Sequence, residues 1–143
     1  MFIGEYYHTI DTKKRLAIPV KFRKDLGRKA VLTRGLDNCL YLYPLEEWKK
    51  LAEKISRLPI SRSDSRAFSR LMLAGAMEVS LDRLGRILIP DYLKEYSELG
   101  KKVVAVGLYN RIEIWDEVKW NSYKKETTKE AESIAEKMNE LGI

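Results

Sequence analysis

An aspartate and an arginine recur four residues apart at two places in this chain of 143 residues. Asp11 precedes Arg15, Asp82 precedes Arg86, and each arginine is followed three residues later by an Ile-Pro pair. An aspartate at the start of a turn accepts backbone N–H groups, and it can orient a guanidinium across the turn. Such an arginine could bind the O6 and N7 atoms of guanine, or it could only close the turn as an ion pair. The spacing alone leaves both interpretations open.

Three more basic residues lie inside the same two turns. Lys13 and Lys14 belong to the first turn and Arg83 to the second. Side chains of this kind bind phosphates and set the register of a protein on DNA without reading its sequence. The candidate DNA-binding residues are therefore Lys13, Lys14, Arg15, Arg83 and Arg86, with Asp11 and Asp82 as their acidic support.

The charge of the chain is positive overall and unevenly distributed. The formal net charge is +6, with nine Lys or Arg and two Asp between positions 11 and 34. From position 116 to the end there are five Lys and seven acidic residues. A clustered basic surface attracts polyanions, and nucleic acid is the first candidate. A membrane surface is a weaker candidate, because the basic residues do not follow one face of an amphipathic helix.

Residues that could perform catalysis or bind a metal are scarce. The single histidine, His8, and the single cysteine, Cys39, cannot form a His/Cys metal cluster within one chain. No phosphate-binding glycine loop or Gly-x-Ser-x-Gly motif occurs, and no carboxylates stand at a recognisable catalytic spacing. We therefore expect no enzyme activity, no cofactor, no metal and no catalytic residue. The absence of a signal-peptide pattern, of a membrane-length apolar run and of paired cysteines favours a cytoplasmic protein.

The similarity between the two halves extends well beyond the two turns. Leu26-Gly27 corresponds to Leu99-Gly100, and Trp48 corresponds to Trp120, at offsets of 71 to 73 residues throughout. Units of about 45 residues are too short to bury separate cores. The sequence therefore predicts a single domain over 1–143, with repeat one at about 5–57, repeat two at about 77–141, and a connecting helical segment at about 60–76.

Each repeat reads as strand, turn, strand, short helix, strand, turn, strand. Strands are expected at 5–10, 15–18, 30–33, 39–43, 102–106 and 111–115, and two more flank the break at 82–85 in the second repeat. Short helices are expected at 20–26 and 91–99. Gly85 suits a tight turn, whereas Lys14 at the matching place predicts a looser or strained one. Eight such strands related by a pseudo-twofold axis would close a small barrel, which makes the fold class α+β.

Longer helices follow each repeat. The first should contain Pro44 in its opening turn and end before Pro59, and another, capped by Asp64 or Ser65, should run to about Gly75. Apolar residues at spacings of three and four predict one long helix over 116–141. That helix could pack on its own domain or between subunits.

The quoted motifs resemble the MraZ family over nearly the whole chain. The resemblance rests on the start Met1-Phe2-Ile3-Gly4-Glu5-Tyr6, on both Asp-x-x-x-Arg turns, and on the Gly35-Leu36 turn followed by Asn38. The wider relatives are the AbrB-like swapped-hairpin transcription factors, which carry one such unit per chain. The resemblance implies a small pseudo-twofold swapped-hairpin barrel, built from two tandem repeats and flanked by helices.

The resemblance also implies a function. Members of the family are bacterial transcriptional regulators that bind direct repeats in the promoter of the division and cell-wall gene cluster containing their own gene. The implied partners are double-stranded DNA and further copies of the chain in an octamer-like ring, located at the nucleoid in the cytoplasm. By motif, Arg15 and Arg86 would contact DNA. The helix after Pro19 is basic and the helix after Pro90 is acidic, so the first repeat should dominate the electrostatics.

An antitoxin-type AbrB-like protein, which binds DNA and also a protein partner through a disordered tail, is the alternative. The periodic segment at 116–141 argues against that alternative, because such tails usually lack apolar periodicity.

Overall fold

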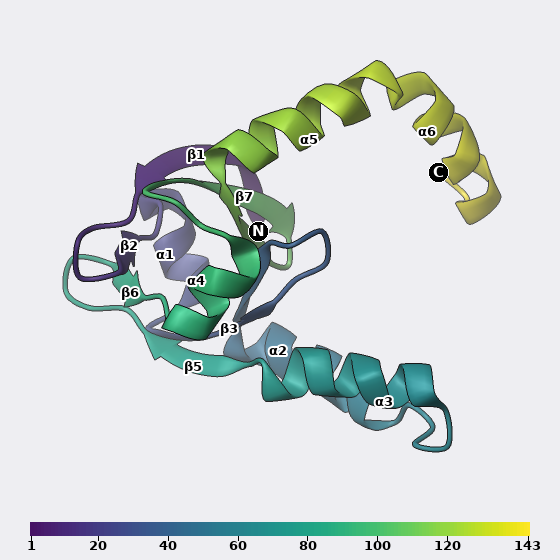
Figure 1. Ribbon diagram of the computed structural model, residues 1–143, viewed down its shortest axis with the longest axis horizontal. Coiled ribbons are helices and arrows are strands. Elements are labelled where there is room, and N and C mark those ends of the chain that lie inside the picture. Colours follow the sequence, from purple (N-terminus) through teal and green to yellow (C-terminus); the bar gives the residue numbers. More distant parts are fainter.

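The two repeats exchange strands to form one continuous antiparallel sheet (Figure 1). The computed structural model describes residues 1–143. The first strand of each repeat pairs with the third strand of the other repeat, so that β1 lies on β7 and β5 lies on β3. The sheet order is β1-β7-β8-β4-β3-β5, with bounds β1 Phe2–Thr9, β3 Lys29–Arg34, β4 Leu40–Pro44, β5 Met77–Ser80, β7 Lys102–Tyr109 and β8 Ile112–Asp116.

A short two-stranded ribbon closes this sheet into a barrel. The ribbon pairs β2 (Arg15–Ala17) with β6 (Arg86–Leu88), again one strand from each repeat. A bridge between Ile10 and Leu16 joins β1 to β2. At the equivalent place in repeat two, the backbone N–H of Asp82, which follows β5, donates to the carbonyl of Arg86 in β6 at 2.9 Å. The eight strands thus form the predicted swapped-hairpin barrel, in which few strand edges remain open.

The core lies between the sheet, the ribbon and two short helices. Alternate residues of a strand face opposite sides, so Leu16 and Ile87 point inward from the ribbon and are almost fully buried. Helix α1 (Val20–Leu26) contributes Phe22, and helix α4 (Asp91–Ser97) contributes Leu93. Each helix begins directly after the proline of an Ile-Pro pair, and that proline is the N-cap residue, with an extended ψ of 135° in one helix and 146° in the other.

The boundaries of these elements differ from the predicted ones at several places. Strand β1 begins at Phe2 rather than at residue 5, since its pairing with β7 extends that far. Helix α4 ends at Ser97, two residues early, because Glu98 adopts a left-handed conformation (φ 51°) that terminates the helix. Pro44 ends strand β4 and precedes α2 instead of lying in its first turn.

A first helical arm leaves the barrel between the two repeats. It comprises α2 (Leu45–Ser56), α3 (Ser63–Ser69) and a π-helical turn at Arg70–Ala74, so the predicted single helix to Gly75 changes its hydrogen bonding part-way. The predicted cap is also wrong, because the carboxylate of Asp64 binds the guanidinium of Arg62 instead of capping α3.

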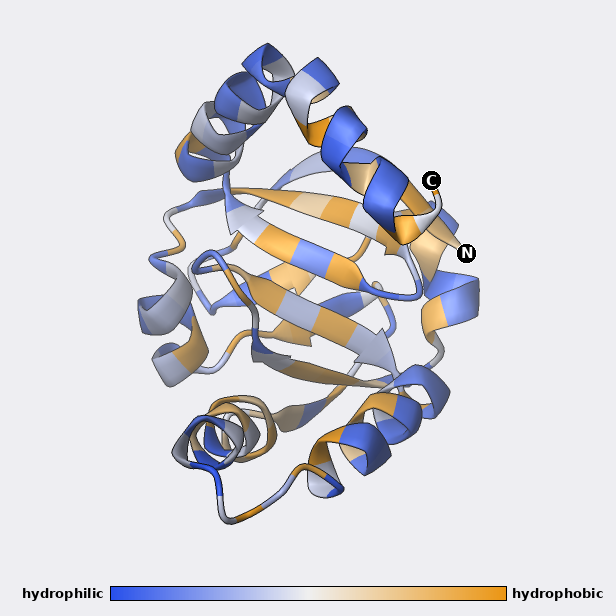
Figure 2. Cartoon of the chain, turned by 90° about the vertical axis from the view of Figure 1, so that its right-hand side faces the viewer, coloured by the Kyte–Doolittle hydropathy of each residue, from blue (hydrophilic) through white to orange (hydrophobic).

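A second arm follows β8 and extends away from the barrel (Figure 1). The predicted continuous helix over 116–141 is wrong, since the arm consists of α5 (Glu117–Lys129), α6 (Ala131–Met138) and a 3₁₀ turn at Asn139–Leu141. Only its root is packed, with Trp120 and Tyr123 stacked around Trp115 at ring distances of 5.2 and 5.1 Å. The hydropathy colouring of Figure 2 shows that beyond this root the arm is mainly hydrophilic.

Candidate nucleic-acid interface

Each aspartate of the repeated motif organises its own turn. One carboxylate oxygen of Asp11 accepts the backbone N–H groups of Lys13 and Arg15, both at 2.9 Å, and the other accepts Nε of Arg15 at 2.8 Å. Asp82 does the same with the backbone N–H groups of Leu84 and Arg86 at 2.9 Å and with Nε of Arg86 at 2.8 Å. The two turns have matching hydrogen bonds because these bonds depend on local geometry: in each turn, all of the bonded groups lie within five consecutive residues.

These hydrogen bonds also keep both aspartates ionised. The backbone N–H of Arg15 is the largest cause that lowers the pKa of Asp11, and the backbone N–H of Arg86 plays the same part for Asp82. A carboxylate that accepts several N–H groups is stabilised in its charged form. The turns therefore keep a fixed negative charge behind each guanidinium at neutral pH.

The two turns have the same backbone path despite a difference in sequence. Lys14 and Gly85 occupy matching positions, with φ angles of 63° and 73°. Their backbone N–H groups donate to the carbonyls of Asp11 and Asp82 at 3.0 and 2.9 Å. The first turn is therefore as tight as the second, and Lys14 bears the left-handed conformation that glycine adopts without strain.

The ribbon brings the two arginines together on one outer face. Arg15 is paired with Leu88 and Ala17 with Arg86, so the two guanidiniums lie diagonally across the ribbon. Nη1 of Arg86 lies 3.9 Å from the carboxylate of Asp11, which links the two turns. The side chains of Arg15 and Arg86 are only 33% and 25% exposed, so they lie against the ribbon rather than projecting from the rim.

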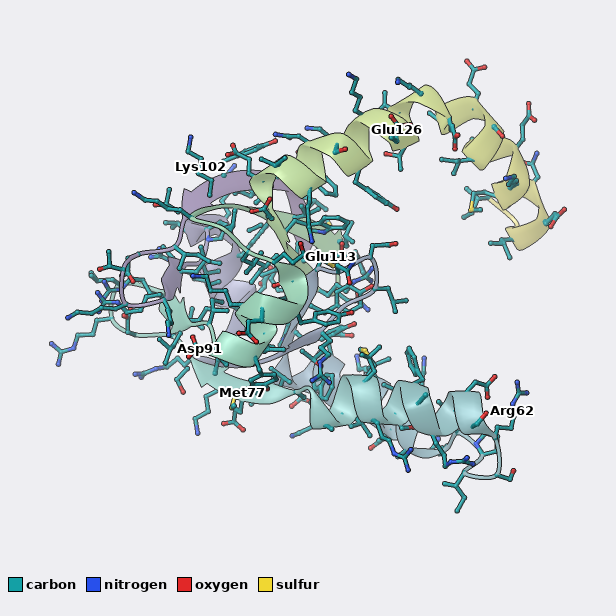
Figure 3. All side chains as sticks on the ribbon, viewed as in Figure 1. Arg62, Met77, Asp91, Lys102, Glu113 and Glu126 are labelled. Atoms are coloured by element: carbon teal, nitrogen blue, oxygen red, sulfur yellow. The ribbon has the colours of Figure 1, made fainter.

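The remaining predicted residues surround these arginines unequally. Lys13 and Arg83 are exposed at the tips of the turns. Lys14 is not free, because its ammonium is paired with the carboxylate of Asp91 at the start of α4. Figure 3 labels Asp91 on the side of the molecule where both turns lie, away from the arms.

Two clefts flank the turns, and each is formed by both repeats. One, of about 460 Å³, lies between the second turn and the end of α1, and its basic side chains are Arg23, Lys24, Arg28 and Arg83. The other, of about 620 Å³, lies between the first turn and the end of α4, with Lys14, Lys94 and Lys101 as its basic side chains. The helix residues among these were not among the candidates, since their closeness to the turns depends on the strand exchange. Their signal in the sequence is that positions 23 and 94, and 28 and 101, are basic in both repeats.

Comparison with known proteins agrees with this geometry. The family described as "MraZ protein, putative antitoxin-like" matches residues 1–71 and again residues 72–141. The chain belongs to the MraZ family. It is 54% identical to a protein of Acetivibrio thermocellus, 52% to one of Clostridium tetani and 51% to one of Moorella thermoacetica, each over 143 residues that cover all of both chains. All three MraZ relatives are named "Transcriptional regulator MraZ".

The titratable residues of this MraZ-family chain are not clustered in the way that a metal site needs. No three His, Cys, Asp or Glu side chains are grouped so that they could hold a metal ion. His8 is half-buried in β1, and Cys39 is fully buried directly before β4. None of the helices combines the length and apolar character needed to span a bilayer. The basic surface around the turns is therefore the candidate site.

Proposed function

We propose that this protein is a sequence-specific DNA-binding regulator of transcription whose Asp-x-x-x-Arg turns present Arg15 and Arg86 to base edges. The observation that supports it best is that β2 and β6 hold both motifs on one outer face. The name shared by the relatives supports a regulatory role over a catalytic one. A two-stranded ribbon of this kind fits the major groove of B-DNA.

The hydrogen bonding of each arginine suits base recognition. Asp11 and Asp82 engage Nε, while the terminal nitrogens of Arg15 and Arg86 make no hydrogen bond within the chain. A guanidinium whose Nε is held, and whose terminal nitrogens have at most the 3.9 Å ion pair of Arg86 with Asp11, can donate to O6 and N7 of guanine. Such a contact is worth about 1–3 kcal/mol of discrimination. Lys13 and Arg83 would bind the flanking phosphates, and Lys14 would do so in competition with Asp91.

Membership of the MraZ family supports a further proposal about the target and the location. We propose that the protein binds direct repeats in the promoter of the division and cell-wall gene cluster containing its own gene. This places it in the cytoplasm at the nucleoid. A footprint on the genomic DNA of the host tests this target, and protection confined to unrelated regions would contradict it.

We also propose that the chain assembles into a closed, octamer-like ring. One ribbon contacts few base pairs, so several copies are needed for specificity, and a closed ring avoids endless polymerisation. Apolar side chains left exposed on the second arm, in β1 and at the end of β7 suit such contacts: Ile3, Tyr109, Ile134 and Leu141. Light scattering should give a discrete oligomer, and a stable monomer at micromolar concentration would refute the ring.

An antitoxin-type role is the second candidate, and the family description favours considering it. In that role α6 would bind a different protein rather than a second copy. Removal of residues 130–143 separates the two candidates. Loss of the ring supports self-assembly, whereas an intact ring together with loss of a co-purifying protein supports the antitoxin role.

The decisive experiment compares arginine variants on two DNA duplexes. One duplex is selected by this protein from a random-sequence library, and the other is a scrambled version of it. Arg15→Ala or Arg86→Ala should weaken binding to the selected duplex by about 1–3 kcal/mol per contact. Binding to the scrambled duplex should change less, and the melting temperature should stay near that of the parent.

Two control variants complete this experiment. Lys13→Ala should weaken binding to both duplexes similarly and flatten the salt dependence, as expected for a phosphate contact. Lys54→Ala removes an exposed charge from α2 on the first arm and should leave both affinities unchanged. If Arg15→Ala melts early yet, once folded, binds the selected duplex as the parent does, the turn is structural and the proposed reading role is wrong.

A further inference from the structure

The two clefts beside the turns are related by the pseudo-twofold axis, but their charges are unequal. The cleft between the second turn and α1 has four basic side chains and one carboxylate, that of Asp82. The cleft between the first turn and α4 has three basic side chains and one carboxylate, that of Asp11. The difference grows beyond the clefts, because α4 and the residue after it add Asp91, Glu95 and Glu98 beside Lys94.

The carboxylates near α1 are fewer and directed elsewhere. The only acidic residue of α1 is Asp25, and it is paired with the α-amino group of Met1 at 2.7 Å. In contrast, Asp91 is paired with Lys14, which is a lining residue of the other cleft. In the cleft between the first turn and α4, one of the three cations is therefore already paired. None of the four cations in the cleft between the second turn and α1 is in an ion pair.

We propose that the cleft formed by the second turn and α1 is the dominant phosphate-binding site, so that each subunit lies on DNA with a fixed polarity. The cleft formed by the first turn and α4 is a weaker site, and Asp91 weakens it by pairing with Lys14. This inference rests on the proposed DNA-binding function and adds to it a direction of binding. Because the strands are exchanged, the strong site combines the turn of repeat two with the helix of repeat one.

A matched pair of variants measures the inequality. Arg28 and Lys101 occupy equivalent positions, are both exposed, and accept the backbone N–H groups of Leu81 and Ile10 through their carbonyls at 2.8 Å. Arg28→Gln and Lys101→Gln each remove one positive charge and leave these backbone hydrogen bonds in place. Their effects on folding should therefore be alike, and thermal melts of both variants check this.

The measurement is a salt titration of binding to a non-specific duplex of fixed sequence. Each phosphate contact contributes about −0.9 to the slope of log affinity against log salt concentration. Arg28→Gln should reduce the steepness of the slope by about 0.9, and Lys101→Gln by less than half as much. Equal reductions, or a larger one for Lys101→Gln, would overturn the proposal.

Removal of the competing carboxylate gives a change of opposite sign. Asp91→Asn should release Lys14, steepen the slope and raise the affinity by roughly two- to five-fold, the range for one exposed ion pair. Asp25→Asn, near the end of α1, serves as the control for Asp91→Asn and should change the affinity by less. No gain of affinity for Asp91→Asn means that the pair does not compete with phosphate.

The polarity itself is tested by directed DNA cleavage. Leu84 is 63% exposed at the tip of the second turn, and Cys39 is buried, so Leu84→Cys offers one reactive thiol for an iron chelate that cuts DNA. On the duplex selected from the random library, cleavage should fall on one side of each binding site. Equal cleavage on both sides would refute a fixed polarity. If the parent protein fails to bind DNA in a salt-dependent way, the proposed function itself is wrong.

Discussion

Replacement of Gly85 by alanine tests the strand exchange directly. A Cβ atom at this position would lie 2.2 Å from Nε and 2.3 Å from Cζ of Arg23, a residue of the other repeat. Arg23 is held there by a hydrogen bond of 2.8 Å from Nε to the carbonyl of Ile18. The substitution must therefore strain the backbone of the second turn and displace the Arg23 guanidinium as well.

The two effects have different magnitudes. A non-glycine residue in the left-handed region costs about 1 kcal/mol, and Gly85 has a φ of 73°. Loss of the hydrogen bond from Arg23, whose donor is charged, adds about 1.5 kcal/mol. We expect Gly85→Ala to lower the free energy of unfolding by about 2–3 kcal/mol, which corresponds to roughly 6–9 °C in melting temperature.

A double-mutant cycle separates these effects. In a chain that already carries Arg23→Ala, Gly85→Ala should cost only about 1 kcal/mol, because no side chain then covers the turn. Lys14→Ala is the matched control at the equivalent position, and it should cost less than Gly85→Ala since the parent residue already has a Cβ. Urea unfolding of the parent, the two single variants, the double variant and Lys14→Ala gives all five free energies. If Gly85→Ala costs the same with and without Arg23, the helix of repeat one does not cover the turn of repeat two.

Four further outcomes can be checked on the purified protein by unfolding or by chemical modification. The pKa of Asp82 is lowered, so the stability that its charge provides is complete at neutral pH and is lost as the pH falls below the usual value of 3.8. Asp82→Asn should therefore destabilise the folded protein most at pH 7 and least in acid, and urea melts at several pH values would reveal this. Thr33→Val should cost about 1–2 kcal/mol in urea unfolding, because the buried Thr33 hydroxyl donates to the carbonyl of Met72 at 2.7 Å. The Cys39 thiol, whose pKa burial raises, should react with iodoacetamide only after unfolding, and fast alkylation of the native protein would contradict its burial. We also propose that residues 1–143 form one domain, so circular dichroism and tryptophan fluorescence should report a single coincident transition, whereas two separate transitions would indicate independent repeats.

The residues that form each Asp–Arg turn could be predicted from the sequence because the forces involved are local. Asp11 and Arg15 lie four residues apart, and their hydrogen bonds are made with groups between them. For the first turn the sequence left two alternatives, a looser turn or a strained one, and the φ of 63° at Lys14 shows that the turn is strained and not looser. Alternating strand residues and the Ile-Pro pairs also predicted the eight strands, the two short helices and the barrel they form.

The second arm illustrates why some predictions fail. The apolar spacing over 116–141 is compatible with one helix, but only Trp120 and Tyr123 find a partner in Trp115. Beyond that contact the chain has no surface to pack against, and the helix breaks at Glu130, where φ is −104°. A periodic pattern records which side chains could be buried together, whereas burial itself depends on a neighbouring surface.

The sequence by itself thus determined which residues build each turn, and only the tertiary structure decided which residues surround it. Arg23 and Arg28 lie beside Arg83, far away in the sequence, because β5 pairs with β3 of the other repeat. The pairing of Lys14 with Asp91 has the same origin, since it joins the first turn to the second helix. Turn geometry depends on a few consecutive dihedral angles, but the choice of strand partner depends on burial summed over the whole barrel.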